Sequence, residues 1–152
     1  MNSFFYKFLI TFIGEVKKNK KKIVIQNSKS IYNFCFLLYK EGYISSIMFF
    51  KKKLIVQLTG LDYLKFQEKK VNYYYFNNFF LDNGIYRLRS KIPLLQIKIN
   101  STPSKKLYYD LKNIKKYKHL TSTKIYSTSY GFLTCSQCIK KKTGGILICT
   151  LH

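Results

Sequence analysis

The stretch Tyr126-Ser127-Thr128-Ser129-Tyr130-Gly131-Phe132-Leu133-Thr134 places three hydroxyl side chains just before a glycine and a short apolar run. Small hydroxyl groups donate and accept hydrogen bonds and can approach a ligand surface closely. Gly131 allows the following backbone to turn tightly. On its own, Ser-Thr-Ser is typical of an ordinary polar turn. Its meaning therefore depends on the motifs around it.

Motifs on both sides of this stretch resemble those of the ribosomal protein S8 family, whose core reads Ser-Thr-Ser-x-Gly followed by two aliphatic residues. Ser101-Thr102-Pro103-Ser104 begins 26 residues before the triplet, at the place of the family's Ser-Arg-Pro-Gly turn, and Gly144–Cys149 fits its terminal Gly-Gly-Glu-Ile-Ile-Cys strand. In the first half, Asn27–Ile31 resembles a polar cap before the second helix, and Lys40–Ile44 resembles Glu-Glu-Gly-Phe-Ile. The resemblance covers about residues 3–59 and 94–152.

Several positions depart from the family pattern. Tyr126 replaces an aliphatic residue, Cys138 an Ala, Ser104 a Gly and Ile146 a Glu. Lys106 replaces an Arg, so a bidentate or stacking contact there would become a point-charge contact. These departures affect local contacts rather than the fold.

The resemblance implies a non-catalytic protein that docks on the central domain of small-subunit ribosomal RNA. Its partners would be that RNA and neighbouring small-subunit ribosomal proteins, as a single copy in a large ribonucleoprotein, with no small-molecule substrate. A-form RNA is recognised through its minor groove, its 2′-hydroxyls and distorted junctions, and lysines would contact phosphates without reading sequence. The expected RNA-binding residues are Ser127, Thr128, Ser129, Gly131, Ser101, Pro103, Lys105, Lys106, Lys140, Lys141 and Lys142.

The charge of the chain independently indicates a polyanionic partner. It has 28 basic and 6 acidic residues, a net charge of +22, and its 47% hydrophobic content indicates a folded body. Lysines that neutralise phosphates release condensed counterions, whereas an anionic membrane surface is the main rival. The alternative function is accordingly a basic membrane-associated or nucleoid-binding organellar protein.

The composition also favours an organellar gene. The chain has no Ala and no Trp, and Lys, Asn, Ile, Tyr and Phe, which have AT-rich codons, are abundant. We expect a mitochondrial ribosome, with the plastid as the alternative. We also expect synthesis inside the organelle, because Met1 lies only two residues before the first predicted helix and leaves no room for a presequence.

The first sixty residues predict an α/β unit with the order helix, strand, helix, strand, strand. Phe4–Val16 is an apolar helix after a Ser3 cap, and it falls short of the about 20 apolar residues of a membrane span. Ile23–Ile25 suits a strand, and Asn27, Ser28 or Ser30 can cap a helix that ends near Gly42. Two further strands are expected at Tyr43–Phe50 and Leu54–Leu58.

The rest of the chain predicts an insertion followed by a mainly β domain. Residues 61–93 lack a family counterpart and are expected to contact an organelle-specific protein. Alternation of buried and polar positions returns at residues 95–99, before a Pro-containing turn and a short helix at Leu111–Tyr117. The last strands are expected at Ile125–Ser127 and Ile146–Leu151. We predict an α/β (α+β) protein with an N-terminal domain at 1–60, the insertion at 61–93 and a C-terminal RNA-binding domain at 94–152.

Neither a metal site, a cofactor nor a catalytic centre is expected. Cys135-x-x-Cys138 has zinc-ligand spacing, and Cys35 and Cys149 could complete four ligands. However, a second pair with characteristic spacing is missing, and a structural disulfide is disfavoured in a reducing matrix. His119 and His152 are the only near-neutral bases, and no phosphate-binding glycine loop or nucleophile elbow appears.

Overall fold

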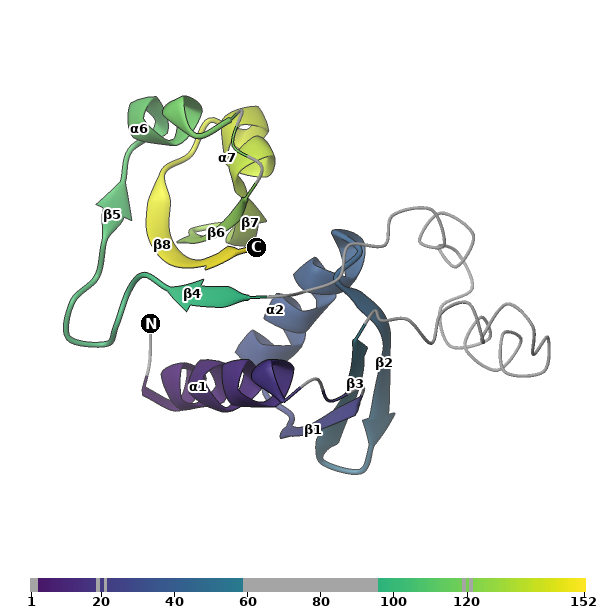
Figure 1. Ribbon diagram of the computed structural model, residues 1–152. Helices are drawn as coiled ribbons and strands as arrows, with labels where there is room; N and C mark the ends of the chain where they lie inside the picture. Colours follow the sequence, from purple (N-terminus) through teal and green to yellow (C-terminus); the bar gives the residue numbers. More distant parts are fainter. Residues whose placement is uncertain (1–2, 19, 21, 59–95, 119, 121) are drawn as a thin grey trace. The chain divides into compact units, whose positions relative to one another are not determined.

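The computed structural model describes residues 3–18, 20, 22–58, 96–118, 120 and 122–152. The predicted insertion at 61–93 and His119 lie outside these residues. In chain order (Figure 1), the elements are α1 (Ser3–Lys17), β1 (Lys22–Gln26), α2 (Lys29–Lys40), β2 (Ile44–Phe50), β3 (Lys53–Leu58), β4 (Ile97–Ile99), β5 (Tyr108–Tyr109), α6 (Leu111–Lys116), β6 (Thr123–Thr128), β7 (Gly131–Thr134), α7 (Cys135–Lys141) and β8 (Gly145–Leu151). The predicted α+β class is confirmed.

The chain divides into two compact units, one of which is not continuous in sequence. One joins residues 1–18 with 95–152, and the other takes residues 19–94. This grouping places α1 with the C-terminal sheet, whereas the sequence placed it in a domain of residues 1–60. One contact behind the difference is the stacking of Phe5 on Phe132 of β7, with ring centroids 5.2 Å apart. Contacts between segments distant in sequence, such as this one, leave no signal in local periodicity.

The buried side of α1 is aromatic. Phe5, Phe8 and Phe12 succeed one another along the helix with neighbouring ring centroids 5.6 Å apart, and all three are buried. The sequence predicted an apolar helix over Phe4–Val16, and this helix is confirmed. Phe4, at the start of the predicted range, is 44% exposed and does not belong to the buried side.

The unit of residues 19–94 contains α2 and an antiparallel three-stranded sheet in the order β1-β3-β2. Of the three candidate caps for α2, Ser28 is the N-cap, and its side chain accepts a hydrogen bond from the Ile31 N–H at 3.3 Å. The helix ends just before Gly42, whose φ of 88° is the left-handed conformation that favours glycine at this place. Both predicted ends of α2 are confirmed.

The C-terminal sheet is built around β8. One edge of β8 pairs with β6, which pairs in turn with β7, and the other edge pairs with β4 and β5. All these pairings are antiparallel. The register of β6 against β8 shifts between Ile125 and Tyr126, so Ile148 has no partner of its own in β6. Such a bulge bends the strand and locally disrupts its ladder of hydrogen bonds.

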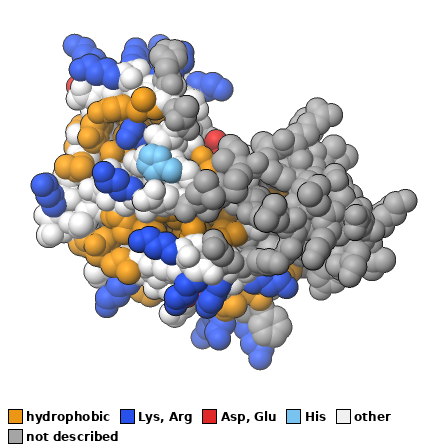
Figure 2. Space-filling view, viewed as in Figure 1, with side chains coloured by type: hydrophobic (Ala, Val, Ile, Leu, Met, Phe, Trp, Pro, Cys, Tyr) orange, Lys and Arg blue, Asp and Glu red, His pale blue; other side chains and the backbone are white. Residues whose placement is uncertain are grey.

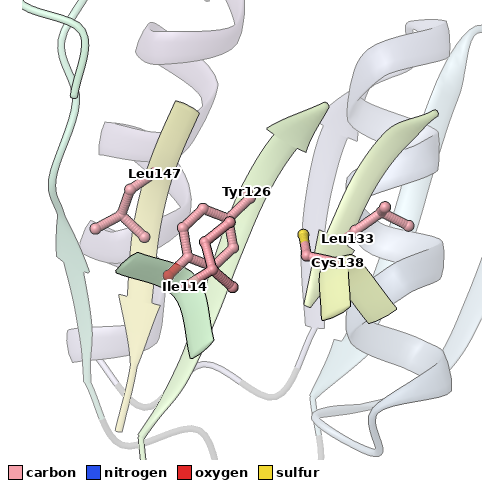
Figure 3. Packing of buried hydrophobic residues seen from close by; sticks show 5 residues of the cluster. All are labelled: Ile114, Tyr126, Leu133, Cys138 and Leu147. Carbon is pink, nitrogen blue, oxygen red and sulfur yellow. The ribbon is translucent and has the colours of Figure 1, made fainter. Parts of the chain in front are cut away.

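The hydrophobic core of this sheet lies between its strands and the two short helices. It consists of Ile114 of α6, Cys138 of α7, and Tyr126, Leu133 and Leu147 from the strands (Figure 3). The Tyr126 hydroxyl is buried and has no hydrogen-bond partner among the described residues. Burial, with smaller contributions from Cys135 and Cys138, raises the pKa of Tyr126. Tyr126 thus stays neutral and acts as a large core residue where the family pattern has an aliphatic one.

The sequence reading assigned no structure to α7. A signal for it exists in the spacing Thr134-x-x-Gln137, because a Gln three residues after a Thr can accept a hydrogen bond from the backbone N–H at the helix start. In the structure the Gln137 side chain accepts from the Thr134 N–H at 3.1 Å. The other short helix, α6, lies where it was predicted, with Asp110 as its N-cap.

Candidate nucleic-acid interface

The Ser-Thr-Ser residues lie at the tip of the β6–β7 hairpin. Thr128 pairs with Gly131 as the last rung, and Ser129 and Tyr130 form the turn between them. Gly131 has a φ of 99°, a conformation that side chains rarely adopt, directly after the turn. The turn therefore comes just before Gly131, whereas the sequence predicted a tight turn in the backbone after it, where strand β7 begins.

Thr128 holds this turn in place. Its hydroxyl donates to the Gly131 carbonyl at 2.9 Å and accepts from the Tyr130 N–H at 3.1 Å. A hydroxyl has one donor and two acceptor sites, so Thr128 keeps a single acceptor site for a ligand. By contrast, the hydroxyls of Ser127 and Ser129 make no hydrogen bond within the described residues, and Ser129 is exposed. The three hydroxyls thus have different roles, which the sequence could not separate.

Two glycines allow the start of β8 to lie against this hairpin and its neighbours. A Cβ on Gly145 would lie 2.6 Å from the Ser127 carbonyl oxygen and 2.8 Å from Cγ2 of Thr128. A Cβ on Gly144 would lie 2.7 Å from the Tyr109 carbonyl oxygen. Because these distances are too short for carbon, the Gly144-Gly145 pair sets how closely β8 approaches both adjacent strands.

The turn after β4 has a buried anchor and an exposed tip. Ser101 is fully buried, and its hydroxyl donates to the Leu147 carbonyl of β8 while accepting from the Leu107 N–H at 3.0 Å. Thr102 and Lys105 then close a β-turn through reciprocal backbone hydrogen bonds of 2.9 and 3.2 Å, with the exposed Pro103 at its second position. The structure therefore uses the Ser101 hydroxyl inside the fold, where it positions the turn.

The predicted site residues form two groups rather than one. The hairpin residues lie on the β6 side of β8, whereas Ser101, Pro103, Lys105 and Lys106 lie on the side that pairs with β4 and β5. Lys140, Lys141 and Lys142 lie at the end of α7, which contacts β6 and β7. Lys141 joins the hairpin group directly, because its ammonium lies 4.8 Å from the centroid of the Tyr130 ring.

Basic side chains surround both groups. The five predicted lysines (105, 106, 140, 141 and 142) are all exposed. The prediction missed the exposed lysines on and beside α6, which are Lys112, Lys115, Lys116 and Lys118. On the face shown in Figure 2, basic side chains are spread over the described surface and acidic ones are few. Such a surface suits a polyanion.

The cysteines are spread over both units. Cys135 and Cys138 lie on α7 and Cys149 in β8, whereas Cys35 lies on α2 in the other unit. Burial raises the pKa of Cys138 to about 11 and the pKa values of Cys35 and Cys149 to about 12. Among the described residues there is no cluster of three or more His, Cys, Asp or Glu side chains suited to a metal ion. In the same residues, no helix is both long and apolar enough to cross a membrane.

Comparison with known proteins gives consistent matches over almost the whole chain. Residues 8–152 match the family model of ribosomal protein S8. The small ribosomal subunit protein uS8 of Borreliella afzelii is 32% identical over 139 residues, which are 91% of this chain and 86% of that protein. The uS8c protein of Oltmannsiellopsis viridis is 27% identical over 133 residues, which are 87% and 84% of the two chains.

Proposed function

The chain belongs to the ribosomal protein S8 family, and from this premise we propose that its β6–β7 hairpin distinguishes the cognate RNA site from other RNA. The lysines around the hairpin supply binding affinity. The protein is a structural, RNA-binding constituent of the small ribosomal subunit and not an enzyme. Family membership thereby removes the alternative of a membrane-associated or nucleoid-binding protein. The proposal concerns which residues read the RNA and where the ribosome resides.

The observation that carries the proposal is the division of roles among the three hydroxyls. Thr128 fixes the turn, whereas the hydroxyls of the half-buried Ser127 and the exposed Ser129 make no hydrogen bond within the described residues. A fixed turn presents these small groups without a large cost in conformational freedom on binding. The minor groove of A-form RNA is wide and shallow and displays 2′-hydroxyls, which both donate and accept hydrogen bonds. The hairpin therefore suits an irregular helix in the central domain of the small-subunit RNA.

The lysines would contact phosphates. Lys140 and Lys142 beside the hairpin, and Lys105 and Lys106 on the other side of β8, are exposed. Contacts between lysine and phosphate orient a protein on RNA but carry no sequence information. The tip of the turn at Pro103 would lie beside the RNA, and the buried Ser101 would act by holding that turn against β8.

The test is the double substitution Ser127→Ala with Ser129→Ala. We expect the variant to bind the cognate central-domain fragment about 10- to 100-fold more weakly, because RNA groups would lose partners at a dehydrated surface, at a cost of about 1–3 kcal/mol. Binding to a scrambled RNA and the slope of log affinity against log salt should stay unchanged, since no charge is lost. Titrations of both RNAs at several salt concentrations give these values.

Two control variants separate the roles. Ser30→Ala removes an exposed hydroxyl from α2 and should change neither affinity nor discrimination. Lys140→Gln should flatten the salt slope by up to about 0.9 and leave the preference for cognate RNA intact. If the double serine variant kept full discrimination, the specificity would not reside in these two hydroxyls.

We further propose that the ribosome is organellar, and mitochondrial rather than plastid. The support is compositional: the chain lacks Ala and Trp and is rich in residues with AT-rich codons. The contact of residues 61–93 with an organelle-specific protein belongs to the same proposal. The chain is expected to co-sediment with mitochondrial small subunits after a high-salt wash, which strips loosely bound proteins. Recovery only with plastid or cytosolic subunits would contradict this location.

A further inference from the structure

We propose that Tyr130, with Lys141 against its ring, is a stacking platform for an unpaired base of the ribosomal RNA. This inference rests on the proposed function of the hairpin and adds a residue that the sequence reading did not include among the site residues. It also assigns the ligand chemistry, which is the flat face of a nucleobase rather than a phosphate or a 2′-hydroxyl.

The first observation is the exposure of Tyr130. Its side chain is 63% exposed at the hairpin tip, next to the exposed Ser129 and Gly131. The small residues on both sides leave room for a large planar ligand to approach. A mostly exposed ring on a surface otherwise rich in lysine contributes nothing to the core and is available for stacking.

The second observation is that the position of Tyr130 is fixed before any ligand arrives. Its backbone N–H donates to the Thr128 hydroxyl at 3.1 Å, and the same hydroxyl donates to the Gly131 carbonyl. The Lys141 ammonium lies 4.8 Å from the ring centroid, which is a cation–π distance. A side chain held in this way loses less conformational freedom when it binds.

An exposed aromatic ring on an RNA-binding surface suits the face of a nucleobase. Unpaired bases in RNA loops and bulges stack on aromatic side chains and are the usual targets of sequence-specific proteins. A Tyr ring has two faces, and Lys141 occupies one of them, so a base would take the other. Lys141 then supports the ring from the face opposite the base. Hydroxyl contacts from Ser127 and Ser129 and stacking on Tyr130 would thus act on neighbouring parts of one irregular site.

The experiment compares Tyr130→Phe and Tyr130→Leu in the titration against cognate RNA. Phe keeps the aromatic face and should bind within about twofold of the unchanged chain. Leu keeps an apolar side chain without a π face and should bind about tenfold more weakly, which corresponds to about 1.4 kcal/mol. The salt slope and the melting temperature should not change, because Tyr130 is neutral and lies outside the core. Tyr108→Leu is the matched control, since Tyr108 is also exposed, at 70%, but lies in β5 on the other side of β8.

The outcomes distinguish this inference from the function on which it rests. If the unchanged chain prefers cognate RNA and Tyr130→Leu binds it equally well, the stacking platform is overturned and the role of the serines stands. If the unchanged chain binds cognate and scrambled RNA alike, the proposed function fails and the platform fails with it. Ultraviolet irradiation of the complex should crosslink the peptide containing Tyr130 to RNA. Crosslinks confined to other peptides of the chain would also overturn the inference.

Discussion

Gly145→Ala is expected to lower the free energy of unfolding by about 3 kcal/mol, near the upper end of the usual cost of inserting a methyl group into a packed site. The added Cβ would lie 2.6 Å from a backbone oxygen of β6, and backbone cannot move aside as the end of a flexible side chain can. Either β8 or β6 must therefore shift. Urea denaturation of the purified chain, followed by circular dichroism, measures the loss.

Gly14→Ala provides the matched control. Gly14 lies within α1, and a Cβ there would meet no heavy atom within 4 Å. Alanine in a helix is more favourable than glycine by about 0.5–1 kcal/mol, so this variant should be more stable than the unchanged chain. Equal urea midpoints for Gly145→Ala and the unchanged chain would show that β8 does not approach β6 as closely as the structure has it.

The second large effect is a loss of stability at alkaline pH. The ordinary thiol pKa is 9.0, and burial raises the pKa of Cys35 and of Cys149 to about 12 in the folded chain. Above pH 9 the unfolded chain releases these protons while the folded chain retains them, so the unfolded state is favoured as pH rises. Between pH 9 and 11 each thiol removes about 2–3 kcal/mol, and below pH 9 it has no effect.

Urea midpoints at pH 8 and pH 10.5 test this expectation. Cys149→Ala should be less stable at pH 8 because of the cavity, but its stability should fall less steeply with pH. Comparing pH dependence between variants also cancels the contribution of every titratable group that the variants share. Cys135→Ala is the control, because Cys135 is only partly buried and its loss should alter the pH dependence less. A pH dependence unaltered in Cys149→Ala would contradict the burial of this thiol.

The sequence predicted those parts of the fold that local chemistry determines. Ser28 and Gly42 allowed both ends of α2 to be predicted, because a capping side chain and a left-handed glycine affect only the nearest turn of the helix. The alternation at the start of the C-terminal sheet is confirmed in β4, where Ile97 is buried and Lys98 is exposed. The turn at Pro103 was recognised for the same reason. Each of these signals involves neighbours in the chain.

What the sequence did not predict depends on partners distant in the chain. Ser101 looked like an exposed turn residue, and only the path of β8 shows that its hydroxyl is buried against Leu147. The membership of α1 in the C-terminal unit depends on side chains more than one hundred residues apart, as in the Phe5–Phe132 pair. Within the site, Thr128 was expected to contact RNA equally with its neighbours, although its hydroxyl is largely used by the turn.

The central place of β8 in its sheet has a consequence for the order of events during protein synthesis. β4, β5 and β6 all pair with β8, which follows every other described strand in sequence. While the ribosome is making the chain, the earlier strands have no template, and a two-stranded hairpin such as β6–β7 is marginal by itself. The RNA-binding unit therefore closes only after its last strand has emerged, even though its first helix was made at the beginning. Nascent chains would engage ribosomal RNA late, after translation of β8 rather than during it.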